Sequence, residues 1–306
     1  MMVAKGKAFA PGHITGFFEI KDDAPKLENK GSRGAGLSID LGVTTEVTIS
    51  EGPRDLSIVL NGSPDEAKTT RDALDELMPP GDIRVSVFSE YSLPVSQGFG
   101  ISGAGALSAG LALKRALQDY NGHLLEFAKI VQAAHCAEVK NKTGLGDVAA
   151  QVMGGFEIRR TPGLPPERNV LRLDQLYGMD RPPIVILCVI GKERYTPSIL
   201  SDPVKREAIN KMGGPLIDAL LNQPSLELFM KNSYRFVHDT GLLTAEVDQA
   251  IEEVSEITMA SMSCLGESIF CICLGESMAD EVSLSLAKFG KVYVCSVDQQ
   301  GARILG

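Results

Sequence analysis

The chain has 306 residues, of which 44% are hydrophobic and 23% are charged, and its formal net charge is −9. The apolar content is too high for an intrinsically disordered chain, and the acidic balance lacks the basic excess typical of nucleic-acid-binding proteins. At roughly 100–200 residues per domain, the length predicts two domains.

The first part of the sequence mixes strand-like and helix-like segments. Apolar or alternating runs predict strands at 43–50, 56–60 and 83–91, and periodic runs predict helices at 63–78, 103–120, 124–140 and 148–153. For the first of these helices we expect Ser63 as the cap, because Pro64 follows it and Glu66 stands three residues later.

A proline-rich segment at 161–166 is the predicted domain boundary, which divides the chain into residues 1–163 and 164–306. The second part is expected to contain strands at 170–173, 184–190, 269–274 and 292–297, and helices at 203–221, 246–262 and 277–289. Its closing strand–helix–strand order is typical of a ferredoxin-like sandwich. Runs of strands followed by helices in both parts favour an α+β fold over a doubly wound sheet.

The sequence gives no sign of export or of membrane insertion. Its first residues lack an apolar stretch of signal-peptide length, and no run approaches 18 apolar residues. The six cysteines form no C-x-x-C pair. Cys271 and Cys273 could share a metal ion, but we interpret them as buried free thiols. We therefore expect a reduced, cytoplasmic protein that has no nucleic-acid or membrane partner.

The glycine-rich segment 94–108 carries the strongest local signal. Four glycines, at 98, 100, 103 and 105, allow the backbone to turn tightly and to approach a ligand closely. The helix expected after them directs its free N–H groups and the positive end of its dipole toward this loop. Such a helix start favours a bound anion, above all phosphate.

Three interpretations of the loop follow from its residues alone. Gly98-x-Gly100-x-x-Gly103 matches the dinucleotide-binding fingerprint, but Asp119 lies at a helix end, where the fingerprint needs a strand that carries an acid. A Walker A loop needs a lysine that is absent here. The glycines could also serve only the close packing of helices.

The same loop resembles the phosphate-binding motif of the GHMP kinases, with Gly98-Phe-Gly-Ile-Ser102 in place of Gly-Leu-Gly-Ser-Ser. Other motifs follow in the family order. Ala10-Pro-Gly-His13 resembles the first motif, in which the family has lysine in place of histidine. Gly144-Leu-Gly-Asp147 resembles the turn that carries the catalytic aspartate, and Glu138 matches the acidic magnesium ligand. The third motif, near Gly266, is degenerate, which leaves its phosphate-side role open.

Five stretches, at 10–18, 31–36, 98–107, 144–147 and 301–303, together resemble the archaeal pantoate kinase family over nearly the whole chain. The resemblance implies an ATP-dependent phosphotransferase with an alcohol acceptor, which converts pantoate to 4-phosphopantoate in coenzyme A biosynthesis. It also implies a two-domain α+β GHMP kinase fold. The N-terminal, ATP-binding domain would be S5-domain-2-like, and the C-terminal domain would be ferredoxin-like.

The resemblance further implies a site for ATP and Mg²⁺. The residues that would bind the ATP phosphates are Gly98, Phe99, Gly100, Ile101, Ser102, Gly103, Ala104 and Gly105. Ser102 and Glu138 would bind Mg²⁺, and Asp147 would accept the proton of the attacking hydroxyl. The carboxylate of pantoate calls for a fixed cation beside an apolar wall. The candidates for this substrate site are His13, Arg33, Arg159 and Arg160.

Without the resemblance, these residues have simpler interpretations: Glu138 as a solvated helix acid, Asp147 as a helix cap and His13 as a polar core residue. Among enzymes, another GHMP kinase of the mevalonate or homoserine type stays open. Outside the kinases, a non-catalytic nucleotide-binding protein on the same fold and an NAD-dependent oxidoreductase stay open. The sequence also leaves the oligomeric state open, with a homodimer as one alternative.

Overall fold

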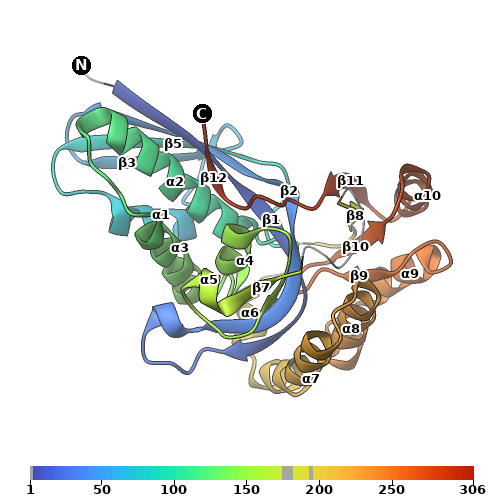
Figure 1. The fold of residues 1–306 in the computed structure, drawn as a ribbon. Helices are drawn as coiled ribbons and strands as arrows, with labels where there is room; N and C mark the ends of the chain where they lie inside the picture. Colours follow the sequence, from blue (N-terminus) through green and yellow to red (C-terminus); the bar gives the residue numbers. More distant parts are fainter. Residues whose placement is uncertain (1–2, 174–181, 193–195) are drawn as a thin grey trace.

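The computed structural model describes residues 3–173, 182–192 and 196–306, which form two β-sheets and the helices packed on them (Figure 1). The strands of the larger sheet are β1 (Val3–Lys21), β2 (Gly31–Glu51), β3 (Asp55–Leu60), β4 (Ser63–Pro64), β5 (Ile83–Tyr91), β6 (Phe156–Arg159), β7 (Val170–Arg172) and β12 (Arg303–Leu305). Their order is β12-β1-β2-β5-β3-β4, while β6 pairs with β2 and β7 pairs with β6.

The smaller sheet contains β8 (Ile184–Val189), β9 (Ala260–Met262), β10 (Ser268–Cys273) and β11 (Lys291–Ser296). Their order is β11-β8-β10-β9, and each pair is antiparallel. Counted along this part of the chain, the order is fourth, first, third, second, which is that of a ferredoxin-like sandwich. The α+β class expected from the sequence is therefore confirmed.

The helices cover both sheets (Figure 1). The first part of the chain contains η1 (Leu27–Asn29), α1 (Lys68–Leu77), α2 (Ile101–Asn121), α3 (Phe127–Asn141), α4 (Asp147–Met153) and α5 (Pro166–Asn169). The later part adds α6 (Thr196–Leu200), α7 (Pro203–Asn222), α8 (Leu226–Asp239), α9 (Ala245–Val254) and α10 (Glu276–Leu286). Helix α2 packs directly on β1 and β2. A β-carbon at Gly6 of β1 would lie 2.1 Å from the carbonyl oxygen of Ala112, which shows how closely this helix approaches the sheet.

Strands β1 and β2 form a long antiparallel pair that runs from Val3 opposite Ser50 to Lys21 opposite Gly31. Only the end of β2 was expected from the sequence. The first residues of β1 alternate between exposed and buried, but the stretch from Ala10 to His13 is buried on both faces. Because both faces are covered, this stretch lacks the alternation by which a strand is recognised.

The expected helix cap at Ser63 is wrong. Ser63 lies in β4, where it pairs with Leu60, and the helix begins only at Lys68. The turn between β3 and β4 is Asn61-Gly62, with φ angles of 46° and 84°. Two positive φ angles are the requirement of a tight hairpin turn, and Asn-Gly is the pair that meets it best. Ser63 and Pro64, which the capping pattern predicted to begin a helix, therefore belong to a β-hairpin.

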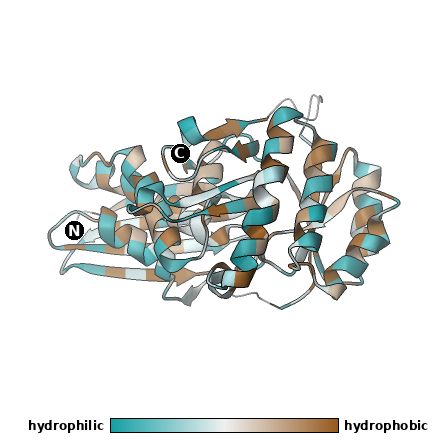
Figure 2. Ribbon diagram, turned by 90° about the horizontal axis from the view of Figure 1, so that it is seen from below, coloured by the Kyte–Doolittle hydropathy of each residue, from teal (hydrophilic) through white to brown (hydrophobic). Residues whose placement is uncertain are grey.

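The expected helix at 246–262 is also too long. Helix α9 ends at Val254, and the residues from Ala260 to Met262 form β9, which pairs with β10. Helix α8, which the sequence analysis did not predict, packs its buried Phe229, Met230 and Phe236 inward. Figure 2 shows hydrophilic and hydrophobic residues alternating along the helices, as expected of helices that bury one face.

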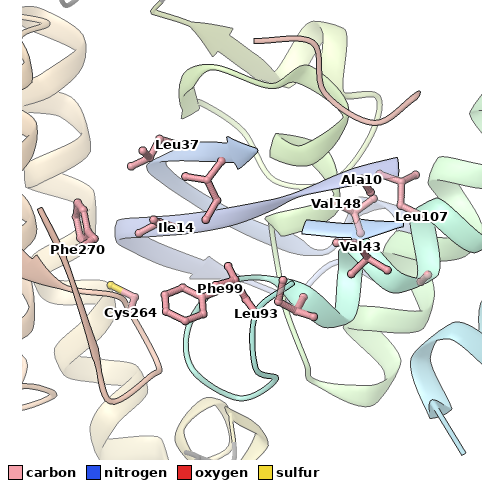
Figure 3. Packing of buried hydrophobic residues seen from close by; sticks show 14 of the residues in the cluster. Ala10, Ile14, Leu37, Val43, Leu93, Phe99, Leu107, Val148, Cys264 and Phe270 are labelled. Atoms are coloured by element: carbon pink, nitrogen blue, oxygen red, sulfur yellow. The ribbon is translucent and has the colours of Figure 1, made fainter. Parts of the chain in front are cut away.

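Phe229 of α8 joins the two sheets. Its ring lies 5.9 Å from that of Phe17 in β1, 5.4 Å from that of Phe156 in β6, and 6.2 Å from that of Phe270 in β10. Figure 3 shows part of this core, in which Phe99 of the glycine-rich loop lies beside Cys264. The two sheets are thus held together by apolar packing.

The division of the chain at residues 163 and 164 remains a proposal. Two strands beyond that point, β7 and β12, pair with the larger sheet, so the later part of the chain also contributes to it. Within the described residues, no helix is both long and apolar enough to cross a membrane.

Candidate active site

A cavity of about 340 Å³ opens where the glycine-rich loop meets the start of α4. Its walls are formed by residues of the segments 65–70, 94–102, 143–147 and 196–200, together with Thr15, Phe18, Ser32 and Cys264. Strands β1 and β2, helices α1, α2, α4 and α6, and the turns beside them therefore all contribute to it. Cavities built from several elements in this way are typical of ligand sites.

The start of α2 forms one wall of this cavity. Gly100 is the residue before the helix, with φ 61°, and no side chain caps the helix start. The first helical hydrogen bond of the backbone runs from Ala104 N to Gly100 O, at 3.1 Å. The N–H groups of the first turn consequently have no helical partner, and they carry the positive end of the dipole. This wall can bind an anion.

The loop glycines also satisfy a packing requirement. Gly98 has φ 79°, and a β-carbon there would lie 2.8 Å from the carbonyl oxygen of Cys264. A β-carbon at Gly100 would lie 3.0 Å from Gln151 Nε2. Of the expected phosphate-binding residues, those from Gly98 to Ser102 line the cavity, whereas the following three, Gly103, Ala104 and Gly105, do not.

Asp147 is the first residue of α4, and its side chain is 19% exposed, at the cavity wall. Gly146, not Asp147, occupies the capping position, and no side chain caps this helix. Instead, Asp147 Oδ1 lies 2.7 Å from His13 Nδ1. The carboxylate is therefore oriented by a histidine of β1, and its interpretation as a simple helix cap does not hold.

His13 is buried between two carboxylates. Its Nε2 lies 2.9 Å from Glu157 Oε1 of β6, and Arg159 donates a hydrogen bond to the same carboxylate oxygen. Burial by itself would lower the pKa of His13, but the hydrogen bonds to Asp147 and Glu157 and the negative charges of these groups raise it above its ordinary value. An imidazolium that donates from both ring nitrogens fits this arrangement.

Glu138 lies behind the cavity wall in α3, with only 2% of its surface exposed. Thr143 Oγ1 donates to its Oε1 at 3.3 Å. Burial and the neighbouring charge of Asp147 raise the pKa of Glu138 well above its ordinary value. A β-carbon at Gly144 would lie 2.5 Å from both Glu138 Oε2 and Asp147 Oδ2, so the two carboxylates converge on one point.

This donor set is suited to a hard cation. Carboxylate and hydroxyl oxygens are the ligands that Mg²⁺ prefers, and Mg²⁺ commonly takes only one or two protein ligands. Glu138 and the cavity-lining Ser102 offer such a pair, and a divalent cation would offset the repulsion between Glu138 and Asp147. Across the described ranges, no group of three or more His, Cys, Asp or Glu side chains forms a complete metal cage.

The expected arginines separate into two groups. Arg159 is buried, and a β-carbon at Gly146 would lie 2.5 Å from Arg159 Nε and 2.6 Å from Ser32 Oγ. Gly146 and Ser32 both line the cavity, so Arg159 stands directly behind its wall. Arg33, in contrast, donates to Glu19 and Asp218, and it does not line the cavity. Arg160 donates to Arg168 O at the surface, so the structure does not bring it to the site.

Comparison with known proteins decides the family. Residues 67–155 match the model of the GHMP kinases N terminal domain. A pantoate kinase of Methanocaldococcus jannaschii is 34% identical over 90% of this chain and 96% of its own length. The chain belongs to the pantoate kinase family. A second family member, from Thermococcus kodakarensis, is also 34% identical and covers 87% of both chains.

Solved structures agree with membership of the pantoate kinase family. A protein described as a phosphotransferase related to the CoA biosynthesis pathway has a TM-score of 0.86 at 28% identity, and the match covers 99% of both chains. A homoserine kinase of Cytophaga hutchinsonii has a TM-score of 0.67 at 18% identity, covering 100% of this chain and 98% of its own, and this match shows the shared fold alone.

Within this pantoate kinase family fold, the dinucleotide-binding interpretation of the loop is wrong, because α3 and not a strand follows α2. The sequence analysis did not name several polar residues of the cavity. Thr15 and Ser32 lie within the stretches at 10–18 and 31–36, and Thr143 directly precedes the Gly144 turn, so their positions carried a hint. Lys68 and Thr70 carried none, because only the fold brings α1 to the cavity.

Proposed function

We propose that this protein is a pantoate kinase, which transfers the γ-phosphoryl group of ATP to the terminal hydroxyl of pantoate and gives 4-phosphopantoate in coenzyme A biosynthesis. The observation that carries the proposal is the meeting of the uncapped start of α2 and the side chain of Asp147 at one cavity. The curated relatives are all pantoate kinases, at 29% to 34% identity.

Phosphoryl transfer requires mainly that two oxygens be aligned and that spreading negative charge be stabilised. The loop from Gly98 to Ser102 and the free N–H groups of α2 would hold the ATP phosphates against the cavity wall. Asp147 would accept the proton of the attacking hydroxyl, because its carboxylate faces the same space. His13 supports this role by holding Asp147 Oδ1 at 2.7 Å, which fixes the orientation of the carboxylate.

Mg²⁺ would be held by Ser102, in the first turn of α2, and by Glu138, whose Oε2 would lie 2.8 Å from a β-carbon at Gly103. A bound Mg²⁺ supplies positive charge that stabilises the phosphate oxygens during transfer.

Pantoate combines a carboxylate, a 2-hydroxyl and two methyl groups. Arg159 Nε is buried and has no hydrogen-bond partner among the described residues, and it lies beside Ser32 at the cavity wall. A buried guanidinium N–H without a partner is well suited to a substrate carboxylate. Phe18, Leu145 and Leu200 supply apolar surface in the same cavity. Arg159 and Ser32 are therefore our candidates for the pantoate carboxylate, whereas Arg33 already pairs with two acids.

The test is ADP release in the presence of ATP and Mg²⁺ with pantoate, pantothenate, mevalonate, homoserine or shikimate. We expect turnover with pantoate well above that with every other acceptor. A preference for mevalonate or homoserine would refute the pantoate assignment and leave the kinase fold intact. ATP binding without turnover on any acceptor would favour a non-catalytic nucleotide-binding protein. The cytoplasmic location and the homodimer remain predictions.

A further inference from the structure

Gln151 carries a buried hydrogen-bond acceptor that has no partner. The residue lies in α4, one turn after Asp147, and it is fully buried. Its Nε2 donates to Gly100 O at 2.7 Å. This bond fixes the orientation of the amide, because exchanging its nitrogen and oxygen would bring two oxygens together. Its Oε1 then has no partner in the described parts of the chain, and a buried acceptor without a partner destabilises the unliganded protein.

The unpartnered oxygen faces the start of α2. A β-carbon at Gly103 would lie 3.0 Å from Gln151 Oε1 and 2.8 Å from Glu138 Oε2. Both oxygens therefore pack against the same residue of the first turn, directly after Ser102. Gln151 Oε1 therefore lies on the same side of α2 as Glu138 Oε2, which belongs to one of the two residues proposed to hold Mg²⁺.

The partner of Gln151 Oε1 must be a donor. The phosphate oxygens of a bound nucleotide are acceptors, and so is the carboxylate of Glu138 when it is ionised. Mg²⁺ in nucleotide sites usually keeps several water molecules, and a water whose oxygen faces the metal presents its hydrogens outward. Such a water is the donor that this position lacks.

We propose that Gln151 is a positioning residue for the magnesium ion, whose amide oxygen accepts a hydrogen bond from a water molecule of the Mg²⁺ hydration shell. The same amide ties Gly100, at the start of the phosphate loop, to the helix that begins with Asp147. One side chain thus links the metal, the loop and the proposed base. The inference rests on the proposed function only in requiring a Mg²⁺-nucleotide at this cavity.

The experiment measures ADP binding by calorimetry, once with Mg²⁺ and once with a chelator, in the full-length protein without pantoate. The ratio of the two affinities measures how much bound Mg²⁺ strengthens ADP binding. Gln151→Met removes both amide atoms, whereas Gln151→Glu keeps an oxygen acceptor but replaces the donor to Gly100 O with a second oxygen and adds a negative charge. Asn232→Leu is the matched control, because Asn232 also carries a buried amide, yet its nitrogen donates to Leu216 O and the residue does not line the cavity.

We expect Gln151→Met to reduce the Mg²⁺-dependent gain in ADP affinity by about 10- to 100-fold, which is usual for the loss of an outer-sphere partner. Affinity in the chelator should change little. Gln151→Glu should keep more of the gain than Gln151→Met, and Asn232→Leu should keep all of it. An unchanged gain in Gln151→Met, or an equal loss with and without metal in both Gln151 variants, would overturn the proposal.

A second measurement needs no variant, in case Gln151→Met does not fold. A crystal structure of the parent protein with ADP and Mn²⁺ should show a water bound to the metal within hydrogen-bond distance of Gln151 Oε1. Another group in that position, or none, would overturn the inference. If the parent protein bound no ADP at all, the proposed function itself would fail, so the two failures are distinguishable.

Discussion

Asp147 and His13 stand 134 positions apart in the sequence, yet Asp147 Oδ1 and His13 Nδ1 lie 2.7 Å apart. The pair joins the first residue of α4 to the middle of β1. On its other side, His13 meets the carboxylate of Glu157, so the imidazole is held from both ends. The orientation of the proposed base therefore depends on a residue that itself stays out of the cavity.

The first prediction concerns His13→Gln. A hydrogen bond to a charged group contributes about 1.5–3 kcal/mol, so kcat should fall by about 10- to 150-fold, while KM for ATP stays close to that of the parent. His13→Lys, which restores a cation at the position where the family motif has lysine, should recover part of the loss. Steady-state kinetics on both variants check this. Normal turnover in His13→Gln would show that Asp147 needs no positioning partner.

A second prediction follows from the raised pKa of His13. Because the folded state favours the imidazolium, its contribution to stability is fully present below the ordinary pKa of 6.5 and is lost as the pH rises through the raised value in the folded protein. The difference in melting temperature between the parent and His13→Gln should therefore be largest near pH 6 and should shrink at alkaline pH. Thermal unfolding of both proteins across that range is the measurement. A difference that grew with pH would mean that His13 is neutral in the folded protein.

The third prediction separates the base from the metal ligand. Asp147→Asn keeps the shape of the side chain and removes the proton acceptor, so kcat should fall by about 10²–10⁴-fold with little change in nucleotide affinity. Ser102→Ala should instead raise the Mg²⁺ concentration needed for half-maximal activity. Near-normal turnover of Asp147→Asn would show that alignment and the metal suffice without a base.

Much of the site could be predicted from the sequence, because its parts lie in short contiguous motifs. The loop from Gly98 to Ser102 and the turn from Gly144 to Asp147 are each local, and both line the cavity. The place of Arg33 could not be predicted in this way. Its glycine neighbours suggested a close approach to a ligand, but its partner Asp218 lies 185 positions away in the sequence.

In the fold, too, elements that depend on neighbouring residues could be predicted, whereas elements that depend on contacts between distant residues could not. The helix from Ile101 to Asn121 was predicted to within a few residues, because its start and its turn signals are local. The hairpin at Asn61-Gly62 was missed because the competing capping pattern at Ser63 is equally local, and only the pairing with Leu60 decides between them. The unpartnered oxygen of Gln151 could not be predicted from the sequence, because it depends on the hydrogen bond from Gln151 Nε2 to Gly100 O.

The fourth prediction concerns the substrate carboxylate. Arg159→Lys keeps the charge beside Glu157 but removes the planar fork and its Nε–H, so KM for pantoate should rise by about tenfold or more while KM for ATP changes little. Arg33→Lys is the control, because Arg33 lies outside the cavity in pairs with Glu19 and Asp218, and its kinetics should stay those of the parent. An equal rise in both KM values for Arg159→Lys would indicate a structural role for this arginine.

The central claim is that the terminal hydroxyl of pantoate receives the phosphoryl group. Phosphorus NMR of the product made from ATP, Mg²⁺ and pantoate tests it directly. Transfer to the terminal hydroxyl places phosphorus next to a methylene group, so the phosphomonoester signal should be a triplet from coupling to two protons. A doublet would place the phosphoryl group on the 2-hydroxyl, and the absence of any phosphomonoester signal while ATP is intact would contradict the assignment as a pantoate kinase.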